Sequence, residues 1–123
     1  PLRNLGGMGG GGNHPDHSAS GEAAMSAVFP SARDHLAFPE HLEEGLEPHK
    51  VEEVYLWGSE EPDVFLDITD TFQTKRDALY CHVSQVGERN EEREARSRER
   101  CATIGTKIGV PLAEQFKRIE VWR

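Results

Sequence analysis

The stretch VEEVYLWGSEEPDVFLDI, residues 51–68, decides the fold class of this chain. Its two apolar runs, at 51–57 and 64–68, are rich in β-branched and aromatic residues and therefore predict two β-strands. The polar segment between them, 58–62, contains glycine and proline and predicts a turn. Helical patterns lie on both sides of the pair, so we expect an α/β protein whose helices cover the strands.

Upstream of these strands the sequence predicts one longer and one shorter helix. Pro15 suits the first position of a helix because its missing N–H is not needed there, and Asp16 in the first turn suits the helix dipole. The next proline of the chain ends the run, which gives a helix at about 15–29. A short helix near 39–44 is expected to stop at Gly45.

Downstream, a helix is predicted at about 70–84, with Thr69 or Asp70 as its N-cap. Its apolar side chains recur at steps of seven, four and three residues. They form one stripe, which consists of Phe72, Leu79, Val83 and Val86.

A last helix is expected at about 91–108, with Gly109 at the C′ position that glycine favours. Its inner face consists of Ser97, Cys101, Ile104 and Ile108. Residues 116–122 alternate and predict a short terminal strand. Only about three strands are visible, which is few for a doubly wound sheet, so their natural neighbours are expected in residues that the chain lacks.

Length and composition limit the classes of protein to which the chain can belong. Its 123 residues suit one modest domain, and a hydrophobic share of 36% allows a small core. The formal net charge of −8 opposes nucleic-acid binding, because phosphate contacts need clustered Lys and Arg. The arginine-rich stretch 89–100 is interleaved with Glu and is interpreted as a solvated helix with i,i+4 ion pairs. No apolar run suits a membrane span and no secretory signal is recognisable, so a cytoplasmic location is expected.

The two cysteines, Cys81 and Cys101, belong to neither a CxxC pair nor a metal-ligand pattern. Both fall on apolar faces of the expected helices. Buried free thiols in a reducing cytosol are therefore the main expectation, and a disulfide between the two helices is the alternative.

Residues 1–13 form a glycine-rich stretch, in which six of the seven residues from Gly6 to Gly12 are glycine. Two interpretations are open: a disordered end or linker, and a flexible active-site loop whose backbone lies close to a ligand. The histidines that follow favour the active-site loop. The chain starts with proline rather than methionine, which suggests that the true N-terminus lies further upstream.

The motif that carries chemistry is His14-Pro15-Asp16-His17. The two histidines are three residues apart and lie on the same side of a first helical turn. One imidazole can then bind a metal while the other faces the substrate, and Asp16 can accept a hydrogen bond from a ring N–H. The spacing alone favours a plainer interpretation, in which these residues cap the helix and contact solvent. A zinc site also needs three protein ligands, and the other histidines stand singly: His35, His41, His49 and His82.

Several stretches resemble, in the same order, the C-terminal half of the LmbE/PIG-L family of zinc-dependent N-acetylglucosaminyl deacetylases. NHPDHSASGEA at residues 13–23 resembles the family's second signature. EVYLW at 53–57, DVFLDIT at 63–69 and the spaced pattern within 75–85 follow it. The resemblance covers roughly residues 6–121, and several motifs in order are more specific than any one of them.

The resemblance implies the C-terminal part of a Rossmann-like, three-layer α/β fold with few strands. Residues 1–13 would be the glycine-rich active-site loop and residues 14–123 the C-terminal half of the deacetylase domain. The implied activity is a zinc-dependent hydrolase that removes an N-acetyl group from an N-acetylglucosamine-type sugar conjugate. The family's Ala-His-Pro-Asp-Asp-Glu signature, which supplies two zinc ligands and the general base, is absent here. The chain alone is therefore expected to be inactive, and its expected partner is a missing N-terminal half or a second copy in a homo-oligomer.

By the same resemblance, Zn²⁺ is the cofactor and His17 is its ligand in this chain. His14 would face the substrate carbonyl, stabilise the oxyanion and assist protonation of the leaving group, and Asp16 is grouped with it as catalytic. His82 and Gln85 are implied at the rim of the sugar site, although a histidine on the surface of a helix is the plainer interpretation. Two other functions stay open: an inactive interaction module of the same fold, and an amidase of a thiol–sugar conjugate.

Overall fold

The structure of the chain, a computed structural model, describes residues 14–121. These residues form two compact units. Unit 1 comprises the described chain up to Pro62 together with the segment from Phe116 onward, and unit 2 comprises Asp63–Gln115. The glycine-rich stretch 1–13, predicted to be an active-site loop, lies outside the described residues.

Unit 1 contains the helices α1 (Pro15–Val28) and α2 (Pro39–Glu43), the 3₁₀ helix η2 (Ser31–Arg33) and the strand β1 (Glu53–Trp57). The predicted long helix, short helix and strand are thereby confirmed. Pro15 occupies the first turn of α1, and the extended backbone of Phe29 ends it. The chain leaves the α2 region through Gly45, whose φ of 81° is readily adopted by glycine.

Unit 2 contains the strand β2 (Val64–Asp67), the helices α3 (Phe72–Tyr80), α4 (Val83–Val86) and α5 (Glu91–Gly105), and the first residues of the strand β3 (Ala113–Glu120). Its core is small and consists of the buried side chains of Ile68, Phe72, Cys101 and Leu112. These side chains join the end of β2 to α3, α5 and the start of β3. A core of this size makes the stability of the unit sensitive to any change in its packing.

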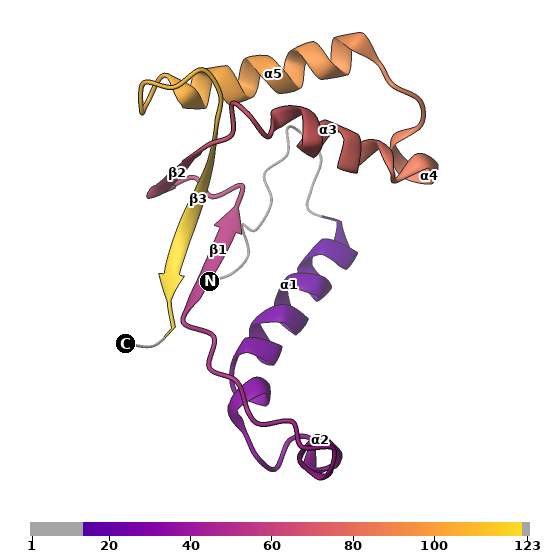
Figure 1. Cartoon of the computed structure of the whole chain (residues 1–123), viewed down its shortest axis with the longest axis vertical. Coiled ribbons are helices and arrows are strands. Elements are labelled where there is room, and N and C mark those ends of the chain that lie inside the picture. Colours follow the sequence, from indigo (N-terminus) through magenta and orange to yellow (C-terminus); the bar gives the residue numbers. More distant parts are fainter. Residues whose placement is uncertain (1–13, 122–123) are drawn as a thin grey trace. The chain divides into compact units, whose positions relative to one another are not determined.

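The three strands are hydrogen-bonded in the order β1-β3-β2 (Figure 1). In unit 1, β1 pairs with β3 antiparallel, with Glu53 opposite Glu120 and Trp57 opposite Phe116. β3 begins at Ala113, earlier than the predicted 116, because Ala113 is fully buried as the strand leaves the core of unit 2. The result is a mixed α/β fold with a small antiparallel sheet, which confirms the predicted fold class.

The bounds predicted for the helix after the second strand are wrong, because this region forms two helices, α3 and α4. The backbone of His82 has φ −85° and ψ 60°, which is not helical and separates them. Thr71, rather than Thr69 or Asp70, stands at the N-cap position of α3. Thr69 is instead held in a turn, where its N–H and hydroxyl donate to Oδ1 of Asp67 at 2.8 and 2.6 Å.

The apolar stripe predicted for this region is only partly buried. Phe72 is buried, but Leu79 is 37% and Val83 69% exposed, because the break after α3 interrupts the helical register. The other buried position on α3 belongs to Arg76, which is 3% exposed. Its guanidinium lies 5.2 Å from the centroid of the Tyr80 ring, and its Nε has no hydrogen-bond partner among residues 14–121.

The helix α5 confirms the last predicted helix but ends at Gly105 rather than at 108. The N–H of Val110 donates to the carbonyl of Gly105 at 3.1 Å, which closes a turn directly after the helix. Ile108 therefore lies in a loop and is 41% exposed instead of belonging to the inner face. Gly109 has a φ of 75° but stands in this loop, not at the C′ position.

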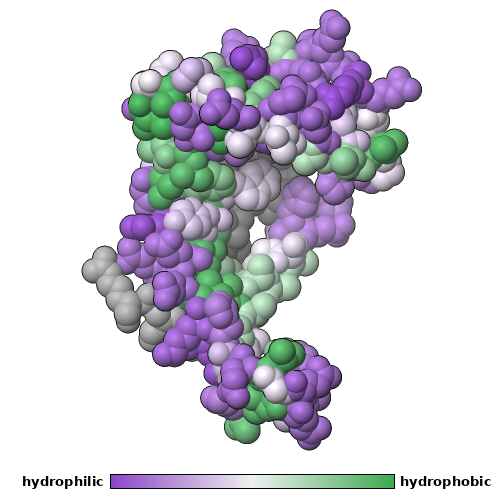
Figure 2. Space-filling view, viewed as in Figure 1, coloured by the Kyte–Doolittle hydropathy of each residue, from purple (hydrophilic) through white to green (hydrophobic). Residues whose placement is uncertain are grey.

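The surface of α5 is strongly hydrophilic (Figure 2). Arg96 and Glu92 form an i,i+4 ion pair at 3.6 Å, and Arg89 and Glu94 approach to 3.1 Å. The solvated helix is thereby confirmed, with one i,i+4 ion pair; the Arg89–Glu94 pair spans five residues and joins the segment before α5 to the helix. Among the helices of residues 14–121, none combines the length and apolar character that a bilayer crossing requires.

Both cysteines are free thiols, as predicted. Cys101 is buried in the core of unit 2, and burial raises the pKa of its thiol. The prediction of burial is wrong for Cys81, which is exposed at the C-cap of α3, because the helix ends there instead of continuing.

Candidate active site

The first turn of α1 is organised by His14, which stands at its N-cap. The backbone N–H of Asp16 donates to Nδ1 of the His14 ring at 3.2 Å. Because Nδ1 acts as an acceptor, this hydrogen bond corresponds to the tautomer that carries its proton on Nε2. The Nε2–H is then free to donate, and the side chain of His14 is 66% exposed. The capping interpretation of the motif is therefore part of its structure.

The expected hydrogen bond from a histidine ring to the Asp16 carboxylate is not formed at His14. Oδ2 of Asp16 lies 3.6 Å from Nδ1 of His14, beyond hydrogen-bonding range, and Nδ1 is already the acceptor of a backbone bond. The Asp16 side chain is 86% exposed. Asp16 thus fixes the orientation of the His14 ring through its backbone N–H, whereas its carboxylate faces solvent.

His17 lies on the same side of the first turn as His14, as the three-residue spacing predicts. The centroids of the two rings are 6.1 Å apart, and the ring planes are inclined by 55°. The ring of His17 is exposed, and its nitrogens have no hydrogen-bond partner among residues 14–121. Its imidazole is therefore available to a metal ion or a ligand.

His17 lines a pocket of about 330 Å³ in unit 1, between α1 and β1. The wall on α1 consists of His17, Ser20, Gly21, Ala24 and Met25, and the wall on β1 consists of Val54, Tyr55, Leu56 and Trp57. Most of these side chains are apolar or small, and a few carry polar groups: His17, Ser20, Tyr55 and Trp57. A mainly apolar pocket with a few polar groups suits a small-molecule or docking site.

The sequence analysis did not identify this pocket. Its only local signal is a pair of small residues, Gly21 and Ala24, which lie three positions apart on α1 and leave room beside the helix. The opposite wall comes from β1, far along the chain, so no spacing rule connects the two walls.

His82 and Gln85 belong to unit 2. His82 stands at the N-cap of α4, and its carbonyl accepts from the N–H of Gln85 at 3.0 Å. Both side chains are exposed. Their predicted place at the rim of the sugar site stays a prediction.

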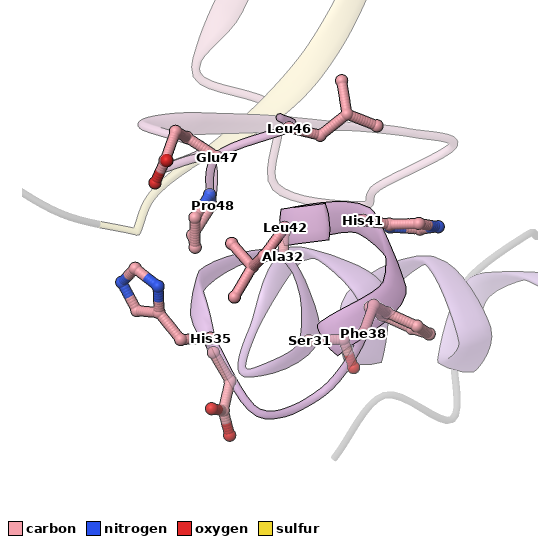
Figure 3. A pocket seen from close by; sticks show the side chains of 10 residues that line it. Ser31, Ala32, His35, Phe38, His41, Leu42, Leu46, Glu47 and Pro48 are labelled. Atoms are coloured by element: carbon pink, nitrogen blue, oxygen red, sulfur yellow. The ribbon is translucent and has the colours of Figure 1, made fainter. Parts of the chain in front are cut away.

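A second pocket in unit 1, of about 100 Å³, lies beside η2 and α2 (Figure 3). His35 and Glu47 line it from one side, and the rings of Phe38 and His41 stack at 5.2 Å (Figure 3). Apolar side chains near it are exposed, and hydrophobic surface is visible over α2 (Figure 2). This pocket is smaller than the one at His17 and lies outside the His14–His17 motif, so it is the weaker candidate.

The described residues offer one candidate ligand for the implied zinc site and do not form a complete site. Among residues 14–121, no group of three His, Cys, Asp or Glu side chains is placed to hold a metal ion. A zinc site needs three protein donors and an open position. The exposed imidazole of His17 fits one of these donors, and the remaining donors must come from elsewhere if zinc binds here.

The mixed α/β fold and the pocket lined by an exposed histidine of α1 are the features to compare with known proteins. No protein-family model matches the sequence. The chain is 32% identical over 75 residues to a diacetylchitobiose deacetylase of Thermococcus kodakarensis. The aligned residues make up 61% of this chain and 28% of that protein. The structure of this chain matches that of an N,N′-diacetylchitobiose deacetylase from Pyrococcus horikoshii in complex with its inhibitor, with a TM-score of 0.71 and 27% sequence identity. That match covers 98% of this chain and 44% of the other.

Agreement in both sequence and structure makes the chain homologous to diacetylchitobiose deacetylases at low identity. The matches reach less than half the length of either relative.

Proposed function

We propose that this chain is the C-terminal half of an LmbE/PIG-L-type deacetylase that hydrolyses the N-acetyl group of an N-acetylglucosamine-type sugar conjugate. One observation carries the proposal: the imidazole of His17, which has no hydrogen-bond partner among residues 14–121, lines a pocket in a fold that matches a deacetylase along 98% of this chain. The named activity of both relatives is deacetylation of diacetylchitobiose, which contains this type of sugar.

His17 is the proposed zinc ligand of this half. Zinc, when bound, polarises an amide carbonyl and activates water. The two further ligands and the general base would come from polypeptide that the chain does not contain. This division explains why the described residues offer one donor and no complete site.

His14 is the proposed donor to the oxyanion that develops when the amide is attacked. The backbone bond at Nδ1 leaves Nε2–H as the donor of the ring, and preorganised donors stabilise transition-state charge. Asp16 is then a positioning residue, because its N–H holds the ring while its carboxylate remains in solvent.

The test is deacetylation of diacetylchitobiose by the assembled protein, that is, this chain together with the segment that supplies the missing ligands. We expect activity with zinc, loss of activity with chelator, and loss of activity in His17→Ala. His49→Ala is the matched control, because His49 is an exposed histidine of the same unit outside the pocket. Activity that withstands both chelation and His17→Ala would exclude the proposal.

A second candidate is a catalytically inactive module of the same fold, which the single visible donor favours. Zinc titration of the chain alone separates the two in part. Weak binding is expected from one imidazole, whereas tight one-to-one binding would contradict the idea of an inactive relic. An amidase of a thiol–sugar conjugate is the third candidate, and a parallel assay with such a conjugate distinguishes it. Two free thiols suit the proposed cytoplasmic location.

A further inference from the structure

The small pocket beside η2 and α2 is bordered by apolar side chains that remain open to solvent. Phe38 and Leu46 line it and are 45% and 55% exposed, and half-buried Leu42 and Pro48 complete its apolar lining. We call these four residues the α2 patch. Single exposed apolar side chains are ordinary, whereas a group of them with a polar rim is typical of an interaction surface.

Backbone hydrogen bonds hold the two sides of this pocket together. The N–H of His49 donates to the carbonyl of Ala32 at 2.7 Å and joins the segment after α2 to η2. The N–H of Leu46 donates to the carbonyl of His41 at 2.9 Å and turns the chain back after the short helix. The pocket is therefore formed in the chain itself, and a preformed surface loses less conformational entropy when a partner binds.

The volume of the pocket indicates the kind of occupant. Pockets for small molecules usually measure about 300–1,000 Å³. This one measures about 100 Å³, which suits one anchoring side chain of a larger partner. The α2 patch is thus better suited to a protein segment than to a sugar or a cofactor.

The rim of the α2 patch is acidic. Residues 34–49 contain five carboxylates and no Lys or Arg, so this segment carries −5 of the formal net charge of −8. None of the five forms an ion pair within 4 Å among residues 14–121. The carboxylates are those of Asp34, Glu40, Glu43, Glu44 and Glu47. A cationic partner would relieve their mutual repulsion.

The same charge disfavours a second copy of this chain as the occupant. In a two-fold dimer the same surface meets itself, so the acidic rims of the two α2 patches would face each other. Like charges brought together at an interface oppose association.

We propose that the α2 patch docks a basic amphipathic helix of a partner protein. The helix inserts one apolar side chain beside Phe38 and Leu46, while its Lys and Arg side chains pair with the carboxylates of the rim. Apolar anchors on one face are the usual means by which a helix binds a groove, and the charged rim selects a basic helix over an acidic one. The proposal does not rest on the proposed function, because the α2 patch lies outside the pocket of His17.

The test uses a fluorescent helical peptide of leucine and lysine, with leucines at positions i, i+3, i+4 and i+7. Fluorescence anisotropy measures its affinity for this chain, and NMR amide shifts locate the site. We expect one-to-one binding with shifts concentrated at residues 36–48, weakened roughly tenfold between about 0.05 and 0.5 M salt because salt screens exposed charges. Two control peptides should bind at least roughly tenfold more weakly. One has glutamate in place of lysine, and the other has the same composition without a shared leucine face.

One pair of variants tests the charged rim. Glu43→Lys combined with Glu44→Lys turns attractions into repulsions and should weaken binding roughly tenfold. Glu60→Lys combined with Glu61→Lys changes the charge of the same unit equally at exposed positions outside the patch. This control should change the affinity by less than about threefold.

A second pair tests the apolar anchor. Leu46→Ser removes an apolar contact at an exposed position and should weaken binding by roughly tenfold or more. Leu66→Ser is the matched control, because Leu66 is 48% exposed on β2 and lies outside the patch. Circular dichroism verifies that each variant is folded.

The absence of binding, equal affinity for the acidic peptide, or amide shifts outside the patch would each overturn the proposal. A dimeric mass by light scattering that Leu46→Ser returns to a monomer would also overturn it, because the occupant would be a second copy. The last control joins to this chain the segment of the Pyrococcus horikoshii deacetylase that lies outside the match, which covers 44% of that protein. Loss of peptide binding in the joined protein would overturn the proposal by assigning the α2 patch to that segment.

Discussion

Replacing Gly105 by alanine should destabilise the core of unit 2. A Cβ at this position would lie 2.4 Å from the carbonyl oxygen of Val110 and 3.1 Å from the carbonyl carbon and oxygen of Pro111. Ordinary contacts of carbon are about 3.5–4.0 Å, so the backbone after the helix must move by roughly 1 Å. That movement is resisted because Leu112 and Ala113, which follow directly, are 3% and 0% exposed.

The magnitude follows from two opposing effects. Overpacking of this kind costs about 1–3 kcal/mol, and the better helix propensity of alanine returns at most about 1 kcal/mol. We therefore expect a net loss of about 1–2 kcal/mol in the free energy of unfolding. For a unit of this size, that loss lowers the melting temperature by about 5–15 °C.

Thermal and urea denaturation, followed by far-UV circular dichroism, measure this loss. Thr103→Ala is the matched control, because Thr103 is exposed on the same helix and its hydroxyl donates to the Glu99 carbonyl one turn earlier. The control should stay within about 0.5 kcal/mol of the parent chain. A Gly105→Ala variant as stable as the parent chain would refute the reasoning, because it would mean that the turn at Val110 yields at no cost.

Three further predictions concern unit 2. Arg76→Met should keep the free energy of unfolding within about 1 kcal/mol of the parent chain, because it removes a buried Nε that has no described partner. Arg76→Ala should lower the free energy of unfolding by about 2–4 kcal/mol, because it leaves a cavity. Urea titration of the two variants compares these losses. Hydrogen bonds from Arg89 and then Gln73 hold the pKa of Asp77 below its ordinary 3.8. Its contribution to stability is therefore present above that value and is lost as the pH falls through the lower pKa of the folded state, so Asp77→Asn should weaken the acid dependence of unfolding below pH 3.8. A thiol reagent should label exposed Cys81 rapidly and buried Cys101 only on unfolding, and equal rates would contradict the assigned burial.

The elements that are bounded by a proline or a glycine could be predicted from the sequence. Pro15 at the start of α1 and Gly45 after α2 act on their own backbone, so the expected bounds and the observed bounds nearly coincide. The helix after β2 could not be bounded in this way. Its apolar spacing assumed one continuous helix, whereas the non-helical backbone of His82 divides it and exposes Val83. Apolar residues at helical spacing share one face only where the helix is continuous.

Half of the candidate site could also be predicted. The three-residue spacing of His14 and His17 is a local property of a helical turn, and both rings lie on one side of α1. The pocket depends on β1, and that neighbour is set by how unit 1 folds rather than by any spacing. The hydrogen bond at Nδ1 of His14 was foreseen only as capping, because the sequence does not indicate which nitrogen of a histidine receives a bond.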